Sequence, residues 1–176
     1  VAVLEGHRPV LVEVQALVSP RPAGSGGFGT RTVTGLVPRR IDLILAVLAQ
    51  RAQLDLSSAD VFVSVAGGLT VREPAADLAI AAAVVSSATL RAVPGDVMML
   101  GEVGLTGELR SVPEPSRRIS EAARLGFSRI VAPRDRSVRP AGGEVEWARS
   151  ARLQQVATLG EAMHAMSLQD AGLRAV

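Results

Sequence analysis

The sequence predicts an α/β (α+β) fold in a single domain, with helices packed on a mixed sheet. Three observations support this prediction. The chain has 176 residues, a usual size for one domain. Segments that alternate between apolar and polar residues, as half-buried strands do, are interspersed with segments in which apolar residues recur every 3 or 4 positions, as in amphipathic helices. Clusters of Gly, Pro and Ser separate these segments.

The N-terminal third predicts two strands and a helix. Residues 10–18 alternate between apolar and polar side chains, and residues 31–37 resume a strand after the Pro/Gly/Ser-rich loop 20–29, so a long hairpin is expected. A helix is expected to follow Pro38, because apolar residues recur there at helical spacing. These residues are Ile41, Ile44, Leu45, Leu48 and Ala52.

The central part continues with a buried strand and a buried helix. Residues 61–66 form a short apolar run that ends at two glycines, and residues 75–87 are apolar on nearly every side, as in a helix enclosed by a domain. Two further strands are expected at 97–100 and 103–109. A helix is then expected from Pro115 to Leu125, followed by strands at 129–132 and 153–156 and a helix at 159–166.

The helix expected at 115–125 also has a predicted orientation. Ile119, Ala122 and Ala123 share one face, which should point inward. Arg117 and Glu121 are four residues apart and are expected to form an ion pair on the outer face.

The composition excludes several kinds of active site. All 19 basic residues are arginines, and cysteine and tyrosine are absent. The chain therefore has no thiolate nucleophile, disulfide, Cys-ligated metal, Schiff-base lysine or P-loop lysine. The longest apolar stretch, 78–85, is far shorter than the roughly 20 residues of a membrane span. Together with the missing cysteine, this favours a cytoplasmic protein without a membrane partner.

Two motifs resemble binding sites without meeting their chemical requirements. Residues 24–30 have the glycine spacing of a P-loop, but Thr30 follows the last glycine where a lysine is required. His7 and His164 lie at opposite ends of the chain, with no second ligand at metal-binding spacing. We therefore expect residues 24–30 to form a hairpin loop, and we expect no metal site at either histidine.

Arginines are concentrated between residues 110 and 152, where there are ten of them against five acidic residues. Solvated helix faces and loops account for about half of this excess. The remainder suggests contact with phosphates. Only Phe127 and Trp147 lie among these arginines, which makes no base-stacking platform, so such contact would be electrostatic and indifferent to sequence. The candidate DNA-contact residues are Arg117, Arg118, Arg134, Arg136 and Arg139.

Two longer segments, 61–87 and 99–133, together resemble the proteolytic domain of the Lon family. They share the order of strand, Gly-bearing loop, acid, Pro, small residues and apolar helix, followed by a Gly-Glu hairpin, a helix and a strand that ends in Pro. This resemblance implies a Lon protease-like, ribosomal protein S5 domain 2-like fold over residues 1–176.

The residues that the Lon resemblance assigns to catalysis are absent. In that family a serine after the proline is the nucleophile, and a lysine in the later helix is its base. Here Ala75 follows Pro74, and the lysine position falls on Ser116, beside two arginines. An alanine methyl cannot attack a carbonyl, and a protonated arginine cannot accept a proton. We therefore expect no catalytic residue and no cofactor site in this chain.

A more specific resemblance rests on residues 4–20 (LEGHRPVLVEVQALVSP) and on the segment Glu73 to Asp77 (EPAAD). These are similar to the C-terminal Lon-like domain of the RadA (Sms) family. The resemblance implies a longer DNA repair protein with a zinc finger and a RecA-like ATPase that uses ATP and Mg²⁺. It also implies a hexameric ring that binds single-stranded or branched DNA, works with a recombinase and drives branch migration in homologous recombination.

Three alternatives remain open at this point. The chain could be the Lon-like domain of a Mg-chelatase-like competence motor, although residues 4–20 fit that family less well. It could be a peptidase with a relocated serine nucleophile, such as Ser64 or Ser116, which a serine-reactive probe would label. It could also be a nucleic-acid-binding module, in which case its affinity should fall steeply with salt.

Overall fold

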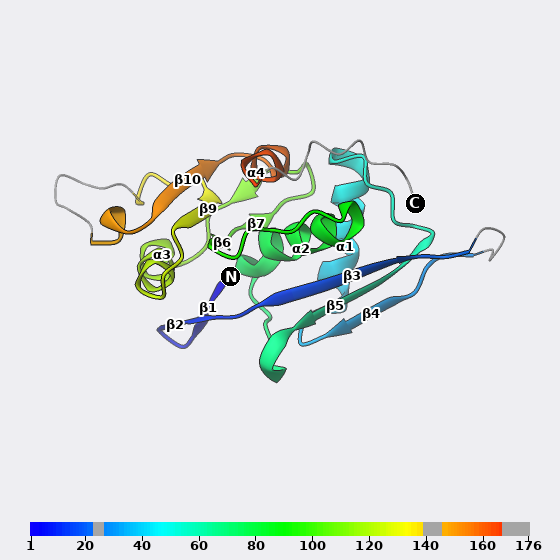
Figure 1. Cartoon of the computed structure of the whole chain (residues 1–176), viewed down its shortest axis with the longest axis horizontal. Coiled ribbons are helices and arrows are strands. Elements are labelled where there is room, and N and C mark those ends of the chain that lie inside the picture. Colours follow the sequence, from blue (N-terminus) through cyan, green and yellow to red (C-terminus); the bar gives the residue numbers. More distant parts are fainter. Residues whose placement is uncertain (23–26, 139–145, 167–176) are drawn as a thin grey trace.

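The computed structural model describes residues 1–22, 27–138 and 146–166 of the chain (Figure 1). Within them, strands and helices alternate, which confirms the predicted α/β fold class. The strands are β1 (Ala2–Glu5), β2 (Arg8–Leu11), β3 (Val14–Pro20), β4 (Arg31–Thr34), β5 (Ala59–Val65), β6 (Val97–Met99), β7 (Glu102–Val103), β8 (Leu109–Arg110), β9 (Arg129–Pro133) and β10 (Arg152–Val156). The helices are α1 (Pro38–Arg51), α2 (Asp77–Thr89), α3 (Pro115–Arg124) and α4 (Leu159–Ala165), with short 3₁₀ turns η1 (Ala66–Gly68), η2 (Pro74–Ala76) and η3 (Glu146–Arg149).

The first sheet has the strand order β3–β5–β4. β3 pairs antiparallel with β5, whereas β4 runs parallel to β5. The predicted hairpin between 10–18 and 31–37 is therefore wrong, because β5 lies between its two strands (Figure 1). Helix α1 connects β4 to β5, and a helical crossover of this kind allows the next strand to run parallel. β5 buries alternate residues more completely than β3 or β4 does, as expected of the central strand.

Helices α1 and α2 lie on one side of this sheet (Figure 1). α1 begins at Pro38. Proline suits this position because the first N–H group of a helix has no partner within the helix, so its absence costs no hydrogen bond. α1 buries the predicted apolar stripe. α2 is buried along most of its length, including Leu78, Ile80 and Val84. It contacts α1, β3 and β7, which explains why the helix is apolar nearly all round.

The second sheet has the order β10–β9–β6, with both strand pairs parallel. Ile119, Ala122 and Ala123 of α3 are buried, as predicted. The single strand predicted at 103–109 is wrong, because the chain turns at its middle and forms the β7–β8 hairpin. Gly107 has a positive φ of 83°, and its N–H donates to the carbonyl of Gly104 (3.0 Å), so the turn needs a residue that tolerates this backbone conformation.

The β1–β2 hairpin joins the second half of the fold at α3. The predicted strand 10–18 is interrupted, since β2 ends at Leu11 and β3 begins at Val14. Val12 lies between them and exchanges two backbone hydrogen bonds with Val1, at 2.9 and 3.0 Å. The break lets the chain leave the small hairpin and enter the first sheet.

Buried apolar residues form two clusters. The larger lies among the first sheet, α1, α2 and α4. The smaller contains residues of α3, β6 and β9, with Trp147 and with Ala75 of η2. The turn η2 therefore lies where the two clusters meet, between the larger cluster's α2 and the smaller cluster's strands. No helix in the described ranges is long and apolar enough to cross a membrane.

Candidate functional site

The turn η2 carries Ala75, the residue that stands where the Lon family has its nucleophile. Its side chain is 1% exposed and packs in the smaller apolar cluster. The carbonyl of Ala75 accepts a hydrogen bond from Gly101 N–H (3.0 Å), and the carbonyl of Gly101 accepts one from Leu78 N–H (3.1 Å). Position 75 thus presents a buried methyl group, and backbone hydrogen bonds to Gly101, on the loop after β6, hold the turn in place.

Arg118 is the side chain of α3 that reaches this turn. It is fully buried, and its guanidinium donates to both carboxylate oxygens of Glu73, at 2.9 and 2.7 Å. It also donates to the carbonyls of Ala2 (2.7 Å) and Pro113 (2.9 Å). Arg118 was a candidate DNA contact, and this expectation is corrected, because a buried guanidinium with four such bonds is not accessible to a phosphate.

A second buried ion pair lies on the other side of the turn. Asp77, at the start of α2, is fully buried and accepts two hydrogen bonds from Arg40 of α1, one of them from Nε at 2.5 Å. Val103 N–H donates a third (3.0 Å). Burial raises the pKa of Asp77, and the hydrogen bonds from Arg40 and Val103 oppose this rise. The sequence patterns did not predict this pair, although a carboxylate opening an entirely apolar helix signals a need for a buried partner.

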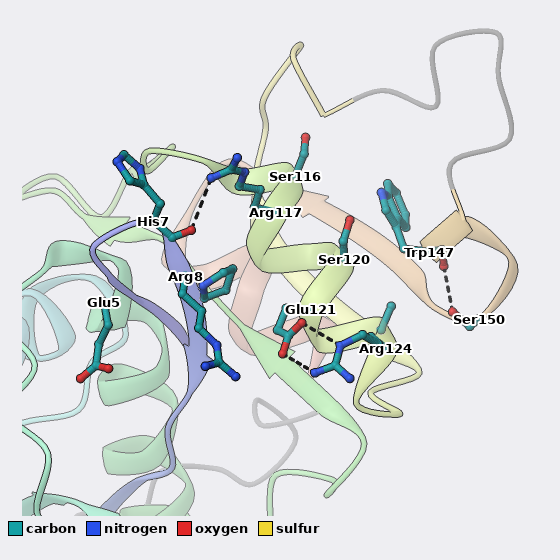
Figure 2. A pocket seen from close by; sticks show the side chains of 12 residues that line it. Glu5, His7, Arg8, Ser116, Arg117, Ser120, Glu121, Arg124, Trp147 and Ser150 are labelled. Carbon is teal, nitrogen blue, oxygen red and sulfur yellow. Dashed lines mark hydrogen bonds and ion pairs between the residues drawn. The ribbon is translucent and has the colours of Figure 1, made fainter.

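Ser116 is exposed and lines a groove of about 920 Å³ beside α3 (Figure 2). The groove is bounded by the β1–β2 hairpin, α3 and the segment around η3. Three arginines, a histidine and three serine hydroxyls line it, with Trp147 at one end. Within the described residues, no histidine or carboxylate is hydrogen-bonded to the Ser116 hydroxyl, and its neighbour in the chain is the cation Arg117.

The arginines of the groove make ion pairs different from the predicted ones. Arg117 lies 3.4 Å from the carboxylate of Glu114 and donates to the carbonyl of His7 (3.3 Å), so the expected pair with Glu121 is wrong. Glu121 instead accepts two hydrogen bonds from Arg124, at 2.9 and 2.6 Å, because the i,i+3 geometry brings these two side chains together. Arg124 lowers the pKa of Glu121, and the charge of Arg8 across the groove contributes. Arg8, Arg117 and Arg124 line the groove together with the carboxylates of Glu5 and Glu121, so it holds more cations than carboxylates.

The central part of the chain shows its family. Residues 39–136, more than half of the chain, match the family model described as subunit ChlI of Mg-chelatase. The chain belongs to this family. The ChlI match includes both buried ion pairs and the turn η2, whereas the β1–β2 side of the groove lies outside it.

The relatives of this ChlI-family chain include several DNA repair proteins named RadA. RadA of Listeria monocytogenes is 41% identical over 163 residues, which cover 93% of this chain and 34% of the relative. RadA of Halalkalibacterium halodurans is 45% identical over 133 residues (76% and 28%), and that of Streptococcus pneumoniae is 46% identical over 135 residues (77% and 31%). These matches confirm the predicted resemblance to RadA. The chain spans about a third of the length of the relatives it matches.

Two other candidate DNA contacts of this ChlI-family domain lie after β9. Arg134 and Arg136 are exposed, and Arg134 lies 3.5 Å from Glu161. Asp135 between them is hydrogen-bonded to Ser111 and Ser137, which lower its pKa and join this loop to the segment leading into α3. Arg139 and part of the P-loop-like segment, residues 24–26, lie outside the described residues. In the described ranges no three His, Asp or Glu side chains gather as a metal ion would require.

Proposed function

We propose that this chain is a non-catalytic Lon-like scaffold domain of a RadA-type DNA repair protein. In this proposal it is the C-terminal part of that protein and promotes assembly of a hexameric ring, which drives ATP-dependent branch migration in homologous recombination together with a recombinase. The turn η2 carries the proposal, because Ala75 offers a buried methyl group and the side chain beside the turn is the permanently protonated Arg118. ATP, Mg²⁺ and zinc would be bound by other parts of the protein.

The groove beside α3 is the proposed DNA contact. Arg8 and Arg117 line it on the side of the β1–β2 hairpin, and Ser116 and Ser120 add two hydroxyl donors on the side toward Trp147 (Figure 2). Arginine and serine side chains are common partners of phosphate oxygens. Arg136, exposed on the loop after β9, is a second proposed DNA contact. Such contacts read the phosphate backbone alone, so the proposed binding of single-stranded or branched DNA is independent of base sequence.

Light scattering of the full-length protein tests the scaffold. We expect a ring-sized particle, and a chain that stays monomeric at high concentration would overturn the proposal. Incubation with unfolded casein and with a fluorophosphonate probe tests the absence of peptidase activity. No turnover and no labelling are expected, whereas labelling at Ser64 or Ser116 would favour the relocated nucleophile instead.

Salt-dependent binding tests the DNA contact. We would measure fluorescence anisotropy of a labelled single-stranded oligonucleotide with the full-length protein and with Arg117→Ala and Arg136→Ala. Each variant should flatten the slope of log affinity against log salt by about 0.7 for each phosphate that it no longer neutralises. Arg129→Ala is the matched control, since Arg129 is exposed but bonded to Asp96 at 2.8 Å. An equal effect of the control would refute a localised DNA-binding surface.

A further inference from the structure

Trp147 places a hydrogen-bond donor at the surface of the groove beside α3. Its side chain is 6% exposed and packs in the smaller apolar cluster. Among the described residues, its indole N–H has no hydrogen-bond partner, and no fully buried polar side-chain atom lacks one. The N–H must therefore reach the surface, and Figure 2 shows the indole nitrogen on the side of the ring nearer to Ser120. Buried rings of this kind rarely leave their donor unpaired, so an acceptor from outside the chain fits here.

The two sides of the groove differ in charge. The side near the β1–β2 hairpin carries the cations Arg8 and Arg117 (Figure 2). The side toward Trp147 carries the hydroxyls of Ser116 and Ser120, which lie one helical turn and thus about 6 Å apart along α3. Both serines are exposed, and in the described ranges neither hydroxyl makes a hydrogen bond. A ligand that matches both sides carries negative charge along one edge and neutral donors and acceptors along the other.

We propose that the side toward Trp147 binds an unpaired nucleobase of a DNA strand whose phosphates contact Arg8 and Arg117. The indole N–H donates to an acceptor atom on the edge of the base, and the hydroxyls of Ser116 and Ser120 bond neighbouring edge atoms. Bases of every kind have acceptors on their edges, so the subsite does not select a sequence. Because almost all of the Trp147 ring is covered, the base is held at its edge rather than stacked.

This subsite gives the groove a preference for single strands. In a duplex the bases are paired and stacked, and a base must leave the stack before it reaches Trp147. A single strand offers its bases without this cost. The groove volume of about 920 Å³ is within the range of pockets that hold small organic ligands, so a nucleotide has room. The inference rests on the proposed DNA contact and deepens it, because arginines that bind phosphates do not by themselves distinguish paired from unpaired bases.

An abasic oligonucleotide tests the base subsite on the full-length protein. We would measure, by fluorescence anisotropy, the affinity for a labelled single strand and for the same strand with its bases removed over the central part, which keeps every phosphate. Trp147→Phe keeps a buried aromatic ring and removes the N–H. The ratio of the two affinities should fall about fivefold in this variant, as expected for one lost hydrogen bond. The slope of log affinity against log salt should stay the same, because no charge is lost.

Two matched controls and a second variant complete the test. Phe127→Leu alters the packing of the same apolar cluster at a position that does not line the groove, so it should leave the ratio unchanged. Ser120→Ala, at an exposed position, should lower the ratio severalfold through the loss of its hydroxyl. Ser128→Ala should not, since Ser128 lies outside the groove and its hydroxyl is bonded to Asp96.

The possible results separate the base subsite from the DNA contact on which it rests. An unchanged ratio in Trp147→Phe, or an equal loss of affinity for both strands, would overturn the base subsite. Should circular dichroism show that this variant does not fold, an unchanged ratio in Ser120→Ala would overturn it instead. The DNA contact would survive either result if Arg117→Ala still flattens the salt slope. If neither strand binds the unmodified protein, both proposals are wrong.

Discussion

The guanidinium of Arg118 donates hydrogen bonds of 2.9 and 2.7 Å to the carboxylate of Glu73, and this pair joins α3 to the turn that carries Ala75. The same guanidinium bonds the carbonyl of Ala2 on β1. One arginine therefore holds three segments together that are distant in the sequence. In a peptidase of the Lon type the corresponding region requires a group that can accept a proton, and an arginine does not do so.

Replacing this arginine should destabilise the fold. Arg118→Ala leaves Glu73, the buried carbonyl of Ala2 and the partly buried carbonyl of Pro113 without their donor. We expect a loss of about 3 kcal/mol in the free energy of unfolding, because Glu73 keeps some contact with water. Urea denaturation would measure it. Arg124→Ala is the control, since that exposed pair with Glu121 should leave the stability nearly unchanged. Similar losses in both variants would show that the buried pair has no special role.

Restoring a hydroxyl at the turn should not restore a peptidase. In Ala75→Ser the new hydroxyl lies in an apolar cluster with no base beside it, so we expect no labelling by a fluorophosphonate probe and no turnover of casein. We also expect about 1–3 kcal/mol of destabilisation from burying a hydroxyl without a partner. Covalent labelling of the introduced hydroxyl would contradict this account of the site.

Substitutions at two glycines with positive φ distinguish the cost of backbone strain from the cost of a steric clash. At Gly35 (φ +72°) an added Cβ would lie 2.5 Å from the carbonyl oxygen of Leu69, whereas at Gly6 (φ +61°) nothing lies within 4 Å. Gly6→Ala should cost about 1–2 kcal/mol from the left-handed conformation alone. Gly35→Ala should cost more, because backbone must move to relieve the contact. Equal unfolding midpoints in urea would be evidence against the close approach of residues 35 and 69.

Acid should destabilise the fold partly through Asp96. Hydrogen bonds from Arg129 and then Ser128 lower the pKa of Asp96 below its ordinary value of 3.8. The folded protein therefore binds this proton less readily than the unfolded chain does. Its contribution is fully present above about pH 5 and is lost as the pH falls below 4 toward the lowered pKa. Asp96→Asn should flatten the pH dependence of unfolding there, measured by urea denaturation at a series of pH values, and an unchanged pH dependence would contradict this assignment.

The order of the four helices and the absence of the Ser-Lys dyad can both be read from the sequence. The stripe after Pro38 and the all-apolar stretch before Ser87 predict two helices correctly, because helical periodicity is a local property of neighbouring residues. The alanine at position 75 is likewise read directly, since the sequence states which residue stands there and packing cannot give a methyl group a nucleophilic atom.

Which strands pair and which charged side chains are buried, in contrast, is decided only by the tertiary structure. β5 separates β3 from β4 because strand pairing depends on residues far apart in the chain, which local alternation does not report. The same holds for Arg117 and Arg118, which are adjacent in sequence. A helix turns by about a quarter of a circle per residue, so one of them faces the groove and the other faces Glu73 inside the protein.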